Sequence, residues 1–212
     1  MTLYNYYRSS ASYRVRIILN YKKIDYKYVP VHLINNNGEH RSAEYTKINS
    51  LQQVPSLVHN QQVITQSMAI AQYLEDIQPK PQLLPTPPLD KAYVLQICEI
   101  INSGIQPLQN LSVLQKVQKN FKSEEEAALW CPFWIKKGFV ALEKKLQTKS
   151  NQFALGNTVS LADVFIVPQL YAAYRYNIDL NDFPCLKKIE SNTKNIEAFA
   201  NAHPNQQVDF PG

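Results

Sequence analysis

The chain has 212 residues, of which 45% are hydrophobic, the usual share for a globular protein with one large or two small domains. Its net charge is +5, yet no block of five or more like charges occurs, so nucleic-acid binding has little support despite the 13 tyrosines. No apolar run approaches the roughly 18 residues of a membrane span, and the N-terminus lacks the pattern of a secretory signal. We therefore expect a cytoplasmic protein with neither a nucleic-acid nor a membrane partner.

Cysteine, histidine and glycine usage excludes several kinds of site. The three cysteines, Cys98, Cys131 and Cys185, are odd in number and far apart, which argues against a disulfide framework and for a reducing compartment. The four histidines show no metal-ligand spacing and no CxxC pair occurs, so we predict no metal site. Only five glycines occur, and the phosphate-binding motifs GxGxxG and GxxxxGK are both absent.

The N-terminal part of the chain alternates between strand-like and helix-like patterns. The patterns predict, in order, a strand over 2–7, a helix over 12–23, a strand over 25–33, a short helix or turn over 42–49, two strands within 54–67 and a helix over 67–77. In the last of these, Ile70, Leu74 and Ile77 share one helical face. The order β-α-β-α-β-β-α indicates an α/β domain.

Regular structure is expected to stop at the segment "QPKPQLLPTPP" (78–88), which holds five of the 13 prolines. Such a segment is typical of a stiff interdomain linker. From Asp90 onward the pattern is helical almost throughout, with one or two helices over 90–118 and a further helical stretch over 124–147, bent near Pro132. We expect a first domain over 1–83 and an all-helical second domain over 84–212.

A capping box marks the start of one helix in the second domain. Ser160 is followed three residues later by Asp163, before a long apolar run. A serine N-cap and an acid at this spacing satisfy exposed helix N–H groups reciprocally. We therefore expect a helix to begin at Ser160.

Three short segments carry residues that suit a ligand. In "YYRSSASYRVRIIL" (6–19), Ser9, Ser10 and Ser12 stand between a strand and a helix. The N–H groups and dipole at a helix N-terminus stabilise an anion such as a thiolate, and a hydroxyl directed at sulfur would lower the thiol pKa. The alternative is that one serine caps the helix and the others are solvated.

The other two segments are "QQVPSLV" (52–58) and "TQSMAI" (65–70). Pro55 fits an edge strand or a cis turn, where Val54 could pair its backbone with an extended peptide ligand. Gln66 and Ser67 directly precede a helix and could hold a ligand carboxylate at its N-terminus. The alternatives are an ordinary edge strand and a helix cap without a ligand.

The order and spacing of these segments resemble the glutathione transferase family. "RSSASYRVRI" is similar to the "RSSCSWRVRI" signature of the zeta class, and "QSMAIAQYLE", "GIQPLQNLSVL" and "VPQLYAAYRY" look like further pieces of that class. The resemblance covers nearly the whole chain. It implies a thioredoxin-like N-terminal domain that binds glutathione, a helical glutathione-transferase C-terminal domain, and a homodimer.

The resemblance also implies roles for individual residues. Ser9 and Ser10 are the candidates to hold the glutathione sulfur as a thiolate, with Ser9 the first choice for catalysis. Residues implied to contact glutathione are Ser9, Ser10, Ala11, Ser12, His40, Val54, Pro55, Gln66, Ser67, Gln106, Asn110, Leu111 and Ser112. Arginines implied to hold a substrate with two carboxylates are Arg8, Arg14 and Arg175. Each arginine could instead form a structural ion pair.

The activity that the resemblance implies is glutathione-dependent isomerisation of maleylacetoacetate to fumarylacetoacetate, a step of tyrosine and phenylalanine breakdown. The substrate is a small diketo acid with two negative charges, and the thiolate would add to its cis double bond, allow rotation and leave. A general glutathione transferase or an α-halo-acid dehalogenase would use the same thiolate. A non-catalytic interaction module with the transferase fold is the third hypothesis, and the retained serines argue against it.

Two departures from the class pattern bear on activity. Ala11 replaces the cysteine that the class has among the serines of residues 9–12, here called the serine loop. The nucleophile belongs to glutathione, so we expect activity to survive. Ser50 and Gln52 replace a proline and a lysine beside the glutathione site. Loss of that lysine predicts weaker binding of the glycine carboxylate and a modestly raised glutathione requirement.

Overall fold

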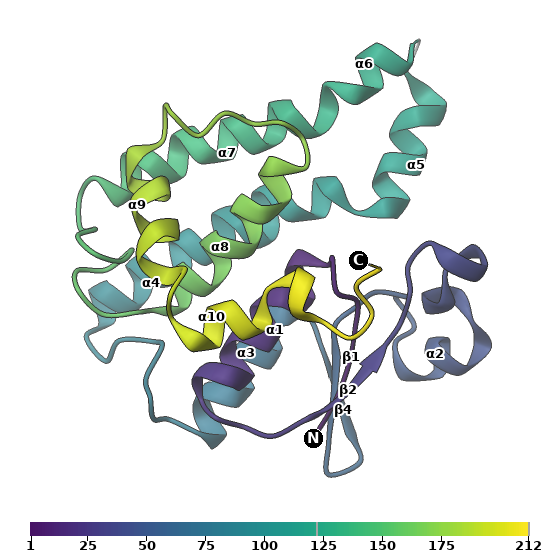
Figure 1. Ribbon diagram of the computed structural model, residues 1–212, viewed down its shortest axis with the longest axis horizontal. Helices are drawn as coiled ribbons and strands as arrows, with labels where there is room; N and C mark the ends of the chain where they lie inside the picture. The colour runs from purple at the N-terminus through teal and green to yellow at the C-terminus, as the bar shows by residue number, and fades with distance from the viewer. Residues whose placement is uncertain (122, 212) are drawn as a thin grey trace. The chain divides into compact units, whose positions relative to one another are not determined.

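The computed structural model describes residues 1–121 and 123–211, and their contacts divide into two units (Figure 1). Unit 1 comprises Met1–Gln82 and Asn195–Gly212, and unit 2 comprises Leu83–Lys194. No helix in the described part of the chain combines the length and the apolar character needed to cross a membrane.

Unit 1 is built on a four-stranded sheet in the order β2-β1-β3-β4. Its elements are β1 (Thr2–Asn5), α1 (Ser10–Tyr21), β2 (Lys27–Pro30), α2 (Ala43–Ile48), β3 (Ser56–His59), β4 (Gln62–Thr65), α3 (Ser67–Ile77) and α10 (Glu197–Ala202). β1 runs parallel to β2 and antiparallel to β3, and β3 and β4 form an antiparallel hairpin. This is the predicted βαβαββα order, and α10 adds a helix that was not expected in this unit.

The core of unit 1 contains two of the three residues predicted to share a face of α3, whereas Ile77, the last residue of the helix, is 41% exposed. Leu3 of β1, Leu57 of β3 and Ile70 and Leu74 of α3 have no exposed surface. α1 contacts both α3 and α10, and Val15, Ile17, Ile18 and Leu19 of α1 are also fully buried. Burying such side chains is the main source of stability of a small α/β unit.

The domain boundary in the second half differs from the prediction of one helical domain over 84–212. Residues 195–212 group with unit 1, because α10 packs against α1. Arg16 Nε donates to the carbonyl of Ala202 at 3.1 Å, and Asn20 Nδ2 donates to the carbonyl of Ala198 at 3.3 Å. An amphipathic sequence predicts a buried helical face, but it does not say which surface covers that face.

Unit 2 is helical, as predicted. Its helices are α4 (Pro88–Glu99), a π-helix (Ile100–Ile105), a 3-10 helix (Gln106–Gln109), α5 (Leu111–Asn120), α6 (Glu124–Ala128), α7 (Trp130–Leu146), α8 (Leu161–Tyr174) and α9 (Pro184–Thr193). The regular pattern expected over 90–118 is interrupted before Pro107, which has no N–H to continue the ladder. Pro132 lies in the first turn of α7, where proline is tolerated, and the break falls at Leu129 instead.

The expected capping box is confirmed at α8. The Asp163 carboxylate accepts the Ser160 N–H at 2.8 Å, the Ser160 hydroxyl at 2.9 Å and the Ala154 N–H at 2.7 Å. Burial raises the pKa of Asp163 to about 6, against the opposing effect of these hydrogen bonds. The box therefore ties the loop before α8 to the first turn of the helix.

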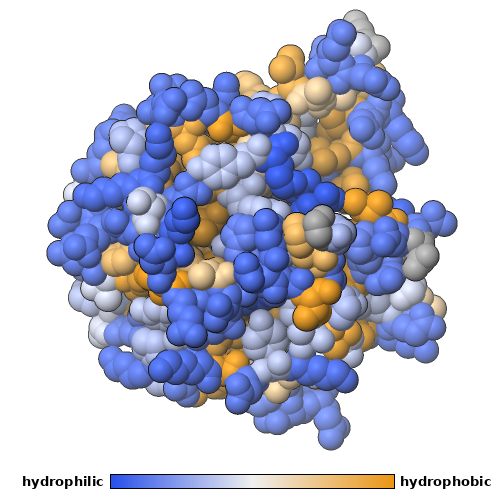
Figure 2. All heavy atoms as spheres, viewed as in Figure 1, coloured by the Kyte–Doolittle hydropathy of each residue, from blue (hydrophilic) through white to orange (hydrophobic). Residues whose placement is uncertain are grey.

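Hydrophilic side chains cover most of the face in Figure 2, with apolar side chains between them. Near α5 and α6 apolar residues come to the surface, at the upper right of the view. Exposed large side chains of α7 and the residue before it include Leu129, Phe133 and Val140.

Candidate functional site

The serine loop lies between β1 and α1. Ser9 is the N-cap of α1, where its Oγ accepts the Ser12 N–H at 3.2 Å and its own N–H donates to the Tyr6 carbonyl at 3.1 Å. Ser9 and Ser10 are half-buried, and the first turn of α1 contains no acidic residue. Their hydroxyls therefore stand at a helix N-terminus whose positive dipole end is not neutralised by an acid of its own first turn.

Ser12 occupies a different environment from Ser9 and Ser10. It is fully buried, and its Oγ accepts the Tyr6 N–H at 3.5 Å while its N–H serves Ser9. Ser12 is therefore buried in the fold and supports the loop through its hydrogen bonds, whereas Ser9 and Ser10 keep exposed surface. Ala11 is half-buried and next to Ser10.

The Val54–Pro55 peptide bond is cis, one of the two arrangements that the sequence allowed. Val54 precedes β3, whose pairing with β1 begins at Ser56, so Val54 lies beyond the ladder. Two side chains of the α2 region hold the preceding carbonyl: Tyr45 Oη donates to the Gln53 oxygen at 2.7 Å and Asn49 Nδ2 donates to it at 2.8 Å. These two hydrogen bonds to the Gln53 carbonyl therefore hold the loop that presents Val54.

The N-terminus of α3 has no side-chain cap, whereas that of α1 is capped by Ser9. Gln66 is its N-cap, with φ +68° and no side-chain cap hydrogen bond. A non-glycine residue at positive φ is uncommon, and such outliers cluster at ligand sites. Ser67 is 4% exposed, and its Oγ accepts from Arg14 Nη1 at 3.1 Å.

Arg14 was expected to contact substrate, but the structure gives it another place. Its side chain is fully buried in α1, and it reaches Ser67 of α3. A guanidinium with no exposed surface cannot meet a carboxylate in solution without moving, so Arg14 supports the N-terminus of α3. Arg8 is half-buried, with its guanidinium carbon 5.9 Å from the centre of the Tyr6 ring.

The sheet brings these three segments to one edge. In the antiparallel register Tyr4 pairs with Ser56, and Ser56 pairs with Thr65. The serine loop follows β1, Val54 and Pro55 precede β3, and Gln66 follows β4. In an antiparallel pair, one strand ends where its neighbour begins. The end of β1, the start of β3 and the end of β4 therefore lie at the same end of the sheet, and the three segments meet there.

His40 lies in a short helical turn of unit 1, Glu39–Arg41, and is 7% exposed. Burial, and secondarily the charge of Arg41, lowers the pKa of the imidazole. The ring is therefore neutral at physiological pH and is held close to Gly38, where a Cβ would stand 2.4 Å from His40 Cε1.

In unit 2 the predicted residues follow the π-helix. Gln106 Nε2 donates to Asn110 Oδ1 at 2.7 Å, and Asn110 is the N-cap of α5, directly before Leu111 and Ser112. A Cβ on Gly138 of α7 would stand 2.2 Å from Cδ1 at the end of the Ile105 side chain, so this side chain of the π-helix packs directly against Gly138. π-helical turns are frequent at functional sites, but the sequence pattern did not predict this one.

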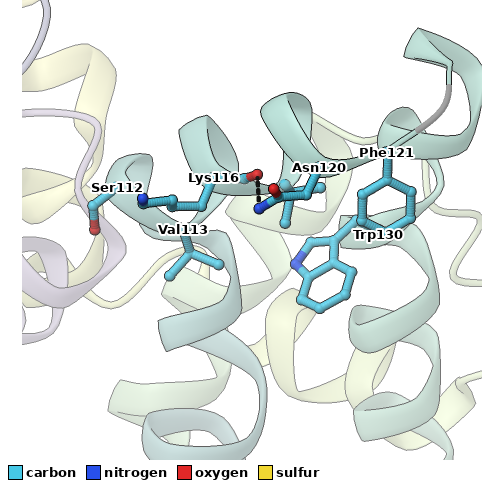
Figure 3. Close-up of a pocket in the computed structure, with 7 residues that line it drawn as sticks. Ser112, Val113, Lys116, Asn120, Phe121 and Trp130 are labelled. Atoms are coloured by element: carbon cyan, nitrogen blue, oxygen red, sulfur yellow. Dashed lines mark hydrogen bonds between the residues drawn. The ribbon is translucent and has the colours of Figure 1, made fainter.

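Arg175 is the C-cap of α8 and is exposed, with its guanidinium carbon 6.0 Å from the centre of the Tyr176 ring. Unit 2 also carries a groove of 490 Å³, shown in Figure 3. Its lining residues are Ser112, Val113, Lys116, Val117, Asn120, Phe121 and Trp130. Ser112 and Lys116 lie toward one end of the groove and Phe121 and Trp130 toward the other (Figure 3).

Comparisons with known proteins identify this arrangement. Residues 1–76 match the family model of the glutathione S-transferase N-terminal domain, and residues 115–197 match that of the C-terminal domain. Maleylacetoacetate isomerase of Mus musculus is 44% identical over 209 residues, which cover 99% of this chain and 94% of that protein. The chain therefore belongs to the glutathione S-transferase family.

Solved structures define its class. The holo structure of a bacterial zeta-class maleyl pyruvate isomerase superposes with a TM-score of 0.94 at 36% identity, covering 99% of both chains. Maleylacetoacetate isomerase of Anaeromyxobacter dehalogenans 2CP-1, with GSH bound in its active site, gives a TM-score of 0.89 at 36% identity, covering 99% of this chain and 97% of that chain. Within the family, this chain is a zeta-class member, which confirms the predicted fold and class.

Proposed function

We propose that this protein is a glutathione-dependent maleylacetoacetate isomerase. The observation that carries the proposal is the meeting of three segments at one sheet edge: a serine-capped helix N-terminus, a cis-proline turn and a second, uncapped helix N-terminus. Relatives at about 40% identity over the whole chain that are named for this activity support it.

The residues of unit 1 fit an extended peptide with a thiol at one point and a carboxylate at another. When bound, glutathione supplies a thiolate that adds to a cis double bond and leaves after rotation. The Ser9 and Ser10 hydroxyls and the α1 N-terminus stabilise a negative charge at sulfur. Val54 offers its backbone beyond the sheet ladder, and the N–H groups that begin α3 suit the γ-glutamyl carboxylate.

Further residues are proposed to complete the site. His40, as a neutral imidazole, offers a hydrogen bond near the glycine end of glutathione, without the charge that a lysine would supply. From unit 2, Gln106, Asn110, Leu111 and Ser112 are proposed to line the site. Arg8 and Arg175 retain exposed surface and are the better placed of the three arginines to hold a substrate with two carboxylates.

Location and assembly are part of the same proposal. We expect a cytoplasmic homodimer. The cysteines support a reducing compartment, because none of the three forms a disulfide bond. Size-exclusion chromatography with light scattering measures the assembly directly: a mass near twice 24.4 kDa supports the dimer, and a mass near 24.4 kDa contradicts it.

The function is tested by one assay on the wild type and on Ser9→Ala. Purified protein is given maleylacetoacetate with and without glutathione, and fumarylacetoacetate is measured. Turnover that requires glutathione and falls in Ser9→Ala supports the proposal. Turnover without glutathione contradicts it, and parallel arms with maleylpyruvate and an α-halo acid decide between the substrates that the class can accept.

A further inference from the structure

A clamp of opposite charges holds the residue that leads into the serine loop. Arg16, in α1, is fully buried and donates from Nη2 to the Tyr7 carbonyl at 2.8 Å. Asp209, near the C-terminus, accepts the Tyr7 N–H through Oδ2 at 3.0 Å. One charged side chain thus fixes each side of the Tyr7 backbone, two positions before Ser9.

Each half of the clamp has further anchors in unit 1. Arg16 also donates to Asn5 Oδ1 at 2.9 Å, to the Tyr6 carbonyl at 3.3 Å and to the Ala202 carbonyl at 3.1 Å. The second carboxylate oxygen of Asp209 accepts a hydrogen bond from the Tyr28 hydroxyl of β2. Hydrogen bonds with a charged partner are about twice as strong as neutral ones, so the clamp defines the path of the loop closely.

The C-terminal segment, defined here as residues 203–211, lies over the same loop. The Phe210 ring stands edge-on to the Tyr7 ring, with centres 5.6 Å apart. In Figure 1 the C-terminal segment passes beside the turn that joins β1 to α1, both within unit 1. The segment therefore reaches the loop through a charged group and an aromatic ring.

We propose that Asp209 is a positioning residue for the glutathione thiolate, acting through the Tyr7 peptide to set the direction of the loop that presents Ser9 and Ser10. This inference rests on the proposed glutathione site. It differs from a contact residue, because Asp209 bonds to Tyr7 and Tyr28 rather than to the serines. Hydrogen-bond donors directed at a developing or bound charge lose much of their effect when they are displaced by about 1 Å.

The conservative variant separates position from charge. In Asp209→Asn the amide oxygen can still accept the Tyr7 N–H, and Tyr28 can accept from the amide nitrogen. In Asp209→Ala both anchors are lost. Asp182→Ala, which removes an exposed acid from unit 2, is the matched control for the change in net charge.

Three measurements are made on each variant: hydrogen exchange at the Tyr7 amide in the free protein, the pKa of the bound glutathione thiol by thiolate absorbance, and kcat at saturating glutathione. In Asp209→Ala we expect exchange to quicken by about tenfold, the thiol pKa to rise and kcat at neutral pH to fall by about tenfold. Asp209→Asn is expected to stay within about twofold of the wild type, and Asp182→Ala to match it.

The inference is overturned if folded Asp209→Ala keeps the wild-type thiol pKa and kcat, or if Asp209→Asn is damaged as severely as Asp209→Ala. Should Asp209→Ala fail to fold, Tyr28→Phe takes its place, since it removes one anchor of the carboxylate. A raised thiol pKa in Tyr28→Phe supports the inference, and an unchanged one overturns it. A wild type that binds glutathione but isomerises nothing contradicts the proposed function alone, because the thiol pKa needs binding only.

Discussion

Among the helices that begin with a serine N-cap, α1 and α8 have caps with different partners. At α8, the Ser160 N–H and hydroxyl both bond to Asp163, and the two residues are 4% and 0% exposed. At α1, the position equivalent to Asp163 is Ser12, and Ser9 remains half-buried at the surface. An acid in the first turn neutralises one helix N-terminus, and its absence leaves the other available to an anion from solution.

The first prediction concerns a variant that adds an acid to the first turn of α1. Ser12→Asp gives α1 the spacing of the α8 capping box and places a negative charge near the proposed thiolate. At about 5 Å and an effective dielectric constant near 20, two like charges repel by about 3 kcal/mol, so kcat should fall by about a hundredfold. Steady-state kinetics of the folded variant measure this, and a variant with near-normal kcat would contradict an anion site at α1.

The second prediction concerns a variant that removes the carboxylate of the α8 capping box. Asp163→Asn leaves one of three donors facing an amide N–H, which should lower the free energy of unfolding at pH 7 by about 2 kcal/mol. Activity per folded molecule should not change. Urea unfolding, followed by tryptophan fluorescence, measures the loss.

The same variant has a pH signature. The pKa of Asp163 is raised by burial to about 6 from 3.8, so the folded protein keeps this proton over a range in which the unfolded chain has lost it. The contribution of Asp163 to stability is therefore fully present below about pH 4 and falls as pH rises through about 6. Asp163→Asn should lack this fall, and equal pH slopes in wild type and variant would contradict it.

A third prediction concerns α3, whose N-cap makes no side-chain hydrogen bond at all. Ser67→Ala removes an acceptor of Arg14 and loosens the proposed carboxylate site, so the glutathione dissociation constant should rise by about tenfold. Isothermal titration measures it. Ser160→Ala is the matched control, which should lose stability but bind glutathione normally.

The smallest expected effect belongs to Gln52. Gln52→Lys restores a positive charge that the class pattern has beside the glutathione site, and an exposed charge pair contributes about 0.5 kcal/mol or somewhat more. We expect the dissociation constant of glutathione to fall by about twofold to threefold. Binding no tighter than that of the wild type would refute the weakened glycine-carboxylate contact.

The sequence predicted unit 1 well because its signals are local. Short alternating strands, the Val54–Pro55 turn and the serines at the starts of α1 and α3 each depend on neighbouring residues, and the sheet register then brings them together. The capping box at Ser160 was equally local. Such features need no knowledge of distant contacts.

The failures involve partners that are far apart in the sequence. Arginines in helices are usually exposed, so the burial of Arg14 and Arg16 was not foreseen. The Arg16 guanidinium donates hydrogen bonds to carbonyls of the residues that lead into the serine loop and to the carbonyl of Ala202. The bond to Ala202 joins α10 to α1. The Ile105 side chain of the π-helix packs against Gly138 of α7, a distant contact that helical periodicity does not reveal.

The most direct test of the account is the thiol pKa of glutathione bound to the wild type, Ser9→Ala and Ser160→Ala. We predict a bound thiol that is more acidic than the free one, a loss of most of that acidification in Ser9→Ala, and no change in Ser160→Ala. If the Ser9→Ala complex ionises like the wild-type complex, the serine at the start of α1 does not stabilise the thiolate, and the central claim fails.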